Sequence, residues 1–175
     1  SLNFIKKICG NKLHKKFSLL DIGAGQGSLK KYLNKNIIYQ GIDIHKQNFK
    51  NVEYNDITVS NPKFKKKYDL IVCFKTIYYL GDQIDKVLKI INSYLKKNGY
   101  LFISYNLKKN SFSNKYLDDL KLRKKMKNLF NEIYTIEINR HLQLEKNKEK
   151  NTLLVFKKKW IFYKIIRFKW KILKI

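Results

Sequence analysis

One short segment constrains the fold of this chain more than any other. The apolar run FSLLDI ends just past Asp21 and is followed by Gly23-Ala24-Gly25-Gln26-Gly27 and then by a helical pattern up to Leu33, so three of the chain's seven glycines fall within five residues. Glycines permit positive φ angles and let a ligand approach the backbone closely. A helix beginning behind them offers free N–H groups and a positive dipole end. The segment therefore predicts a strand, a ligand-binding turn and a helix.

The remainder of the chain, up to Lys157, continues this alternation. Short runs rich in β-branched residues alternate with amphipathic stretches, which is typical of a parallel α/β sheet. Helices are expected from Asp82, as the capping residue, to a stop at Asn98-Gly99, and over Tyr116–Phe130. Strands are expected at Phe17–Ile22, Ile37–Ile44, Asn51–Tyr54, Tyr68–Phe74, Tyr100–Tyr105, Ile133–Ile138 and Thr152–Phe156. The expected fold is a mostly parallel seven-stranded sheet that closes in an antiparallel hairpin and carries helices on both faces.

Polar side chains end three successive strands of this predicted sheet. Asp21 ends the first, Asp43 ends the second about twenty residues later, and Asn55-Asp56 follow the third. Open α/β sheets bind ligands at the carboxyl ends of their strands, and a carboxylate in the position of Asp43 can accept both hydroxyls of a ribose. Asn55-Asp56 would suit an adenine amino group. The pattern predicts a nucleoside site.

At these residues the chain resembles the class I S-adenosylmethionine-dependent methyltransferases, of the small-molecule methyltransferase domain type. The pattern D-x-G-x-G-x-G at Asp21 to Gly27 matches the first motif of that family, and Asp43 matches its ribose-binding acid. The resemblance covers about residues 15–157 and implies a Rossmann-like fold, methyl transfer, and S-adenosyl-L-methionine as the cofactor. It implies cofactor contacts at Asp21, Gly23, Ala24, Gly25, Gly27, Asp43, Ile44, Asn55, Asp56, Ile57, Cys73 and Phe74.

Two other interpretations of the glycine segment stay open. A dinucleotide-binding enzyme would need the spacing G-x-G-x-x-G, and it would normally need a second domain for its substrate. A degenerate fold would bind the cofactor without catalysis.

Catalysis of methyl transfer is a direct displacement, so positioning supplies much of the rate. The candidate catalytic residues are Tyr78, whose ring would face the sulfonium through cation–π attraction, and His141, which would serve as a base for a hydroxyl acceptor. The competing interpretations are helix packing for Tyr78 and an exposed loop position for His141. Lys75 either points outward or meets an anionic acceptor. The three scattered histidines predict no metal site.

Motifs that the chain lacks limit the chemical class of the methyl acceptor. Amino-group DNA and RNA methyltransferases of the common type carry [DNS]-P-P-[YF] after the fourth strand, where this chain reads Cys73-Phe74-Lys75-Thr76. The sequence therefore favours a small-molecule or glycan acceptor, including a lipid-linked one or a surface polysaccharide. An RNA methyltransferase stays open because the formal net charge is +26.

The segment 158–175 differs in composition from residues 1–157, which form the predicted methyltransferase domain. The last 25 residues carry eight cations and no acid. If the segment is helical, Ile161, Ile165, Phe168 and Ile172 share one stripe and Lys164, Arg167, Lys171 and Lys174 another, as in helices that lie on anionic membranes. Nucleic-acid contact or packing on the protein are the alternatives. With no secretory signal pattern and no cysteine framework, a cytoplasmic protein, peripheral at the membrane, is expected.

Overall fold

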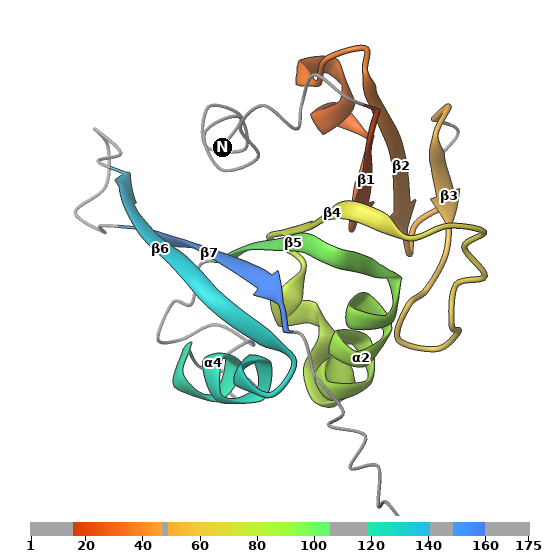
Figure 1. Cartoon of the computed structure of the whole chain (residues 1–175). Helices are drawn as coiled ribbons and strands as arrows, with labels where there is room; N and C mark the ends of the chain where they lie inside the picture. Colours follow the sequence, from red (N-terminus) through yellow and green to blue (C-terminus); the bar gives the residue numbers. More distant parts are fainter. Residues whose placement is uncertain (1–15, 47–48, 106–118, 141–148, 160–175) are drawn as a thin grey trace, which may run out of the picture.

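A computed structural model describes residues 16–46, 49–105, 119–140 and 149–159 of this chain. The elements in chain order are β1 (Phe17–Ile22), η2 (Ser28–Tyr32), β2 (Ile37–Asp43), β3 (Val52–Tyr54), β4 (Tyr68–Phe74), η3 (Ile77–Gln83), α2 (Ile84–Tyr94), β5 (Leu95–Tyr105), α4 (Asp119–Lys127), β6 (Phe130–Arg140) and β7 (Glu149–Lys158). They form the α/β arrangement drawn in Figure 1.

The seven strands make one sheet in the order β3-β2-β1-β4-β5-β7-β6. Strands β1 to β5 pair in parallel, whereas β7 is antiparallel to both β5 and β6. The predicted Rossmann-like sheet with a closing antiparallel hairpin is therefore confirmed. Its parallel pairing brings the ends of β1, β2, β3 and β4 to one edge, where Asp43 lies in register with Tyr54.

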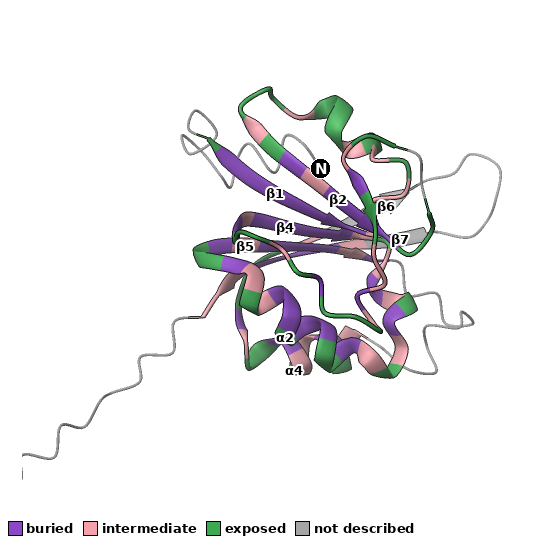
Figure 2. Cartoon of the chain, turned by 90° about the vertical axis from the view of Figure 1, so that its right-hand side faces the viewer, coloured by how far each residue is buried: buried purple, intermediate pink, exposed green. Residues whose placement is uncertain are grey.

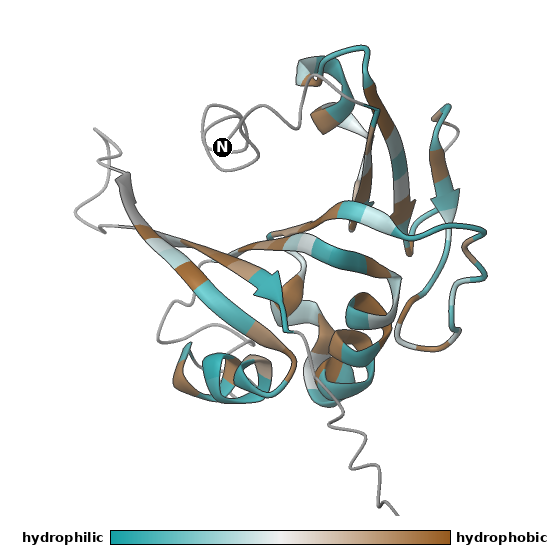
Figure 3. Cartoon of the chain, viewed as in Figure 1, coloured by the Kyte–Doolittle hydropathy of each residue, from teal (hydrophilic) through white to brown (hydrophobic). Residues whose placement is uncertain are grey.

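The sheet is buried on both faces, which is typical of parallel sheets and explains the near-continuous apolar runs in its strands. Figure 2 shows β1, β4 and β5 buried along most of their length. One face packs against α2 and α4, whose buried residues include Val87, Leu88 and Met126. In the described ranges both α-helices lie on this face, and the short 3-10 helix η2 packs Leu29 against the other. Figure 3 shows that α4 is largely hydrophilic, as expected for a helix with one narrow buried stripe.

The helical pattern predicted up to Leu33 is a five-residue 3-10 helix that ends at Tyr32 and has no buried residues. Both predicted boundaries of the next helix were wrong. Asp82 lies inside η3 and does not cap α2, which begins after Gln83 without a side-chain cap. The helix ends at Tyr94 rather than at Asn98, because Leu95 is fully buried and pairs with Tyr68 as a β-strand residue. Tertiary pairing there overrides the local stop signal.

The first two residues of the predicted tail are bonded to the folded domain. β7 continues to Lys158, whose Nζ donates to the carbonyl oxygens of Asn92 at 2.6 Å and Leu95 at 2.9 Å, at the carboxyl end of α2. A cation placed there interacts favourably with the helix dipole. The backbone N–H of Lys159 donates to Leu129 O at 3.2 Å. Residues 160–175, on which the rest of the tail prediction depends, lie outside the described residues.

Candidate functional site

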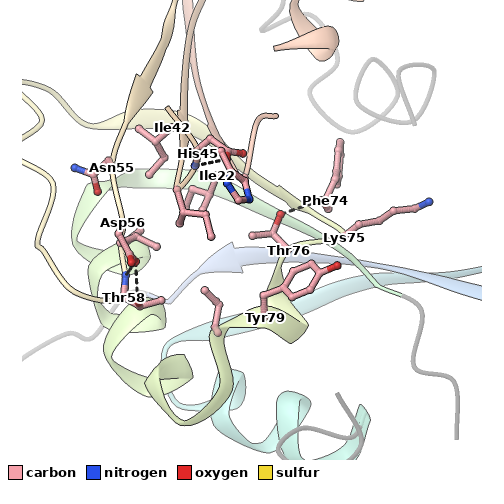
Figure 4. Close-up of a pocket in the computed structure, with 15 residues that line it drawn as sticks. Ile22, Ile42, His45, Asn55, Asp56, Thr58, Phe74, Lys75, Thr76 and Tyr79 are labelled. Atoms are coloured by element: carbon pink, nitrogen blue, oxygen red, sulfur yellow. Dashed lines mark hydrogen bonds between the residues drawn. The ribbon is translucent and has the colours of Figure 1, made fainter. Parts of the chain in front are cut away.

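A cavity of about 500 Å³ opens at the carboxyl ends of β1 to β4, close to the size typical of small-molecule sites (Figure 4). Its base is apolar and is formed by Ile22, Ile42, Ile57 and Leu80, while polar side chains approach from the strand ends. The full lining is Ile22, Gly23, Ile42, Asp43, Ile44, His45, Asn55, Asp56, Ile57, Thr58, Phe74, Lys75, Thr76, Tyr79 and Leu80.

The carboxylate of Asp43 holds the glycine segment against the end of β2. Its Oδ2 accepts the backbone N–H of Gly25 at 2.8 Å and its Oδ1 accepts that of His45 at 2.9 Å. A carboxylate offers about four lone-pair sites. Two therefore stay available for a ligand, although the side chain itself is largely buried.

Glycine is required at Gly23 and at Gly25 for two different structural reasons. Gly23, Gly25 and Gly27 all have positive φ angles, of 73°, 52° and 67°. A Cβ on Gly23 would lie 2.1 Å from Thr76 Oγ1, so the close approach of Thr76 requires glycine there. A Cβ on Gly25 would meet no atom of the chain within 4 Å. The space next to Gly25 is therefore open to a ligand.

Asn55 and Asp56 form the end of the cavity beyond β3. Asp56 Oδ1 accepts the backbone N–H of Thr58 at 2.9 Å and its hydroxyl at 2.6 Å. These bonds hold the pKa of Asp56 below its usual range, with the Thr58 hydroxyl as the largest cause. Asn55 lines the cavity, and its Oδ1 is shielded from solvent and has no hydrogen-bond partner among the described residues. This oxygen is an unused acceptor on a residue of the cavity wall.

The opposite wall follows β4. Phe74, Lys75, Thr76 and Tyr79 line it, and Thr76 Oγ1 donates to Phe74 O at 3.0 Å. Lys75 adopts a positive φ of 56°, unusual for a residue with a side chain. Figure 4 shows its ammonium directed away from the other labelled residues. Of the two expectations for Lys75, the outward orientation is the one observed.

Asp21 lies beneath the glycine segment rather than in the cavity wall. It is buried, and its Oδ2 accepts the hydroxyl of Tyr39 at 2.9 Å. Burial is the main cause that raises the pKa of Asp21 to about 6, and the nearby Asp43 carboxylate adds to the rise, whereas the Tyr39 bond opposes it. Asp21 therefore supports the site indirectly.

This raised pKa predicts the pH dependence of an Asp21→Asn variant. Since the folded-state pKa exceeds the usual value of 3.8, the parent loses stability as the pH rises from about 4 to about 6. A two-unit shift corresponds to roughly 3 kcal/mol at most. The Asp21→Asn variant has no carboxyl group at this position, so it does not lose this stability as the pH rises. In urea unfolding, the free energy of unfolding of the variant minus that of the parent should be about 2–3 kcal/mol larger at pH 8 than at pH 4.

Asp69→Asn is the matched control, because Ser18 and Lys96 bond to Asp69 and its pKa is lowered. The free energy of unfolding of Asp69→Asn should fall below that of the parent by more at pH 8 than at pH 4, which is the opposite trend to that of Asp21→Asn. Equal slopes for the two variants would contradict the assigned burial of Asp21.

The predicted cofactor residues divide into two groups. Seven of them line the cavity: Gly23, Asp43, Ile44, Asn55, Asp56, Ile57 and Phe74. Asp21, Ala24, Gly25, Gly27 and Cys73 do not, and all but Cys73 belong to the glycine segment or the acid before it. Cys73 is a core residue, and burial raises the pKa of its thiol to about 12.

Of the two predicted catalytic residues, the structure describes Tyr78, which does not line the cavity. Tyr78 packs partly buried against the core, and the neighbouring Tyr79, which is 71% exposed, lines the cavity instead. Burial raises the pKa of Tyr78 to about 12, so its hydroxyl is protonated at neutral pH. His141 lies outside the described residues. Sequence reasoning also missed Thr76, whose contact with Gly23 is long-range and leaves no local signal.

Gly41 is a further supporting residue that the sequence did not single out. A Cβ there would lie 2.8 Å from Ala24 Cβ and 3.0 Å from Tyr39 Oη. A glycine inside a strand is a signal that another part of the backbone approaches closely. At Gly41 the approaching part is the glycine segment.

The described part of the chain lacks two further features. None of its helices combines the length and apolar character needed to cross a membrane. Within the same residues, no group of three or more His, Cys, Asp or Glu side chains is arranged to hold a metal ion.

Comparison with known proteins agrees with this fold. The family model described as Methyltransferase domain matches residues 4–153. The chain therefore belongs to the methyltransferase-domain family, and by class it is a methyl-transferring enzyme. No curated protein matches the sequence.

Solved structures show the same fold at low sequence identity. The N-methyltransferase NodS from Bradyrhizobium japonicum, in complex with S-adenosyl-L-homocysteine, superposes with a TM-score of 0.69 at 15% identity, covering 91% of this chain and 84% of that one. A S-adenosylmethionine-dependent methyltransferase from Clostridium acetobutylicum gives 0.65 at 17% identity, covering 89% of each chain. TehB from Haemophilus influenzae gives 0.65 at 19%, covering 90% of this chain and 61% of TehB.

Proposed function

We propose that this chain binds S-adenosyl-L-methionine in the cavity at the ends of β1 to β4 and transfers its methyl group to a small-molecule or glycan acceptor. When bound, the cofactor supplies an electrophilic methyl group on a sulfonium. The observation that carries the proposal is that Asp43 and Asn55 line one cavity at the strand ends, and that Asp43 also holds Gly25, beside whose Cα no described atom lies. The family assignment supports the same enzyme class.

The described residues fit this cofactor in shape and hydrogen-bonding capacity. Asp43 would accept the ribose hydroxyls with its remaining lone pairs. Asn55 Oδ1 would accept an amino hydrogen of adenine, which removes the cost of about 1–3 kcal/mol for a buried unpaired polar group. Ile44, 53% exposed, and Ile57 would cover the ring. An exposed isoleucine in a cavity wall is apolar surface that a ligand can bury.

The methyl acceptor would enter along the β4 wall. Three residues line that side: Phe74 supplies an apolar ring, Thr76 a hydroxyl and Tyr79 a phenol. His45 is the described imidazole in the lining. For an acceptor that loses its proton spontaneously, holding the nucleophile in line is sufficient and no base is required. A hydroxyl acceptor would need a base, and His45 and His141 are the candidates to test.

The test is methyl transfer itself. The full chain is incubated with methyl-labelled cofactor and fractionated cell extract, and label is measured in glycan, lipid, RNA and small-molecule fractions. We expect label in the small-molecule or glycan fraction, lipid-linked glycan included, and none with Asp43→Ala. Label confined to RNA would favour the RNA methyltransferase alternative. Cofactor binding without label in any fraction would indicate a catalytically silent binding protein.

A further inference from the structure

The turn of residues 55–60, which follows β3, forms one end of the cavity and has little support from the sheet. Strand β3 has three residues and lies at the edge of the described sheet, where it pairs with β2. The first four residues of the turn line the cavity, and Figure 4 shows Asn55 and Asp56 at the end away from Phe74 and Lys75. The position of this end of the cavity therefore depends on how the turn itself is held.

The first half of the turn is anchored to the core of the fold. The backbone N–H of Asn55 donates to the carbonyl oxygen of Asp43 at 2.9 Å. The side chain of Ile57 is buried in the same hydrophobic cluster as Ile84 and Leu88 of α2. Both anchors act on the beginning of the turn, before the chain reaches its exposed end.

The second half of the turn is held from outside by Lys86 of α2. Within the turn, the carbonyl oxygen of Asp56 accepts the backbone N–H groups of Val59 at 3.2 Å and Ser60 at 2.9 Å. From beyond the turn, the ammonium group of Lys86 donates to the carbonyl oxygens of Thr58 at 2.7 Å and Val59 at 3.2 Å. Among the described residues, no other hydrogen bond reaches this half of the turn from the rest of the chain.

The charge of Lys86 also acts on the carboxylate at this end of the cavity. The pKa of Asp56 is lowered mainly by the hydroxyl of Thr58, and the positive charge of Lys86 contributes to the same shift. Lys86 is exposed, and exposed cations contribute little to global stability. The effect of Lys86 should therefore be local, on the geometry of the turn, rather than on the stability of the whole protein.

We infer that Lys86 is a positioning residue that fixes the adenine end of the cofactor site, an inference that rests on the proposed function. Asn55 Oδ1 can accept an amino hydrogen of adenine only within a narrow range of distances, about 2.7–3.2 Å between the heavy atoms. A small displacement of the turn would therefore weaken that bond. Lys86 belongs to α2, which directly follows η3, and η3 supplies Tyr79 and Leu80 to the cavity. One ammonium group thus joins the adenine end to the segment that carries part of the cavity's other side.

The test measures how strongly the full chain prefers adenine to a purine without the amino group. Calorimetry gives the affinity for S-adenosyl-L-homocysteine and for its analogue that lacks the 6-amino group. We expect the parent to prefer the natural ligand by about tenfold, because the analogue leaves Asn55 Oδ1 unpaired. In Lys86→Met this preference should fall by about threefold or more, a modest effect because the cation is exposed. Lys86→Arg keeps the charge and the donors, so its preference should stay within about twofold of that of the parent.

The matched control is Lys89→Met, which makes the same change in charge at another exposed lysine of α2 and should keep the preference of the parent. An unchanged preference in Lys86→Met, or equal weakening of both ligands, would overturn the inference. The same loss in Lys89→Met would assign the effect to net charge and would also overturn it. A parent that binds both ligands equally would disprove the adenine end and this inference together. A parent that binds neither ligand would contradict the proposed function itself.

Discussion

Replacing Gly25 with Val should give a folded protein with no detectable binding of S-adenosyl-L-homocysteine in calorimetry. The backbone N–H of Gly25 is fixed on Asp43, which lines the cavity, and no described residue fills the space next to the Gly25 Cα. A β-branched side chain would occupy that space without displacing any described residue. The loss should therefore fall on the ligand.

The control for this variant is Gly81→Val. Gly81 has nearly the same φ, 55° against 52°, and its Cβ would also meet no atom within 4 Å. Gly81 has a ψ of −128°, a conformation that a β-branched residue rarely adopts, so Gly81→Val carries a backbone strain of its own. We expect both variants to lose thermal stability, with cofactor binding lost only in Gly25→Val. Unchanged affinity in a folded Gly25→Val protein would show that the cofactor binds elsewhere.

The second large effect is expected at Asp43. Asp43→Ala removes the acceptor for two ribose hydroxyls, each such bond to a charged group contributing about 1.5–3 kcal/mol. It also removes the bonds that hold Gly25 and His45 at the end of β2. Both losses act in the same direction, so affinity for S-adenosyl-L-homocysteine should fall at least tenfold, or about 1.4 kcal/mol.

A ligand that lacks one ribose hydroxyl separates these two contributions. The 2′-deoxy analogue of S-adenosyl-L-homocysteine should bind the parent more weakly than the natural ligand does. In Asp43→Ala the two ligands should bind equally, because the acceptor for that hydroxyl is gone. If Asp43→Ala still distinguishes the ligands as strongly as the parent does, Asp43 acts only by holding the glycine segment.

The strands were predictable because their signal is local. Tyr68–Phe74 is a run of apolar residues interrupted only by Asp69, and it matches β4 residue for residue. The end of α2 was not predictable in the same way, since residues 95–99 look like a helix with a glycine stop. What places Leu95 in a strand is its pairing with Tyr68, 27 positions earlier, where both side chains are fully buried.

The candidate site shows the same division between local and long-range signals. Asp43 and Asn55 were predicted because polar residues at strand ends converge in any parallel sheet. The choice of Tyr79 over Tyr78 depends on the exact winding of η3, which Gly81 interrupts with non-helical angles. The role of Lys158 was not predictable for a related reason. Lys158 looks like the first residue of a basic run, yet its ammonium group serves the end of α2, 63 positions away in the chain.

The position of β7 affects how this protein folds during synthesis. Among the described strands β7 is last in sequence but lies between β5 and β6, so β6 cannot join the sheet until residues 149–158 have been made. Until then β5, whose Leu101, Phe102 and Ile103 are fully buried in the native sheet, presents an unpaired edge. At about 5–20 residues per second, synthesis from the end of β6 to the end of β7 takes roughly one to a few seconds. During this interval the nascent sheet has an open, apolar edge suited to chaperones and to pairing with other chains.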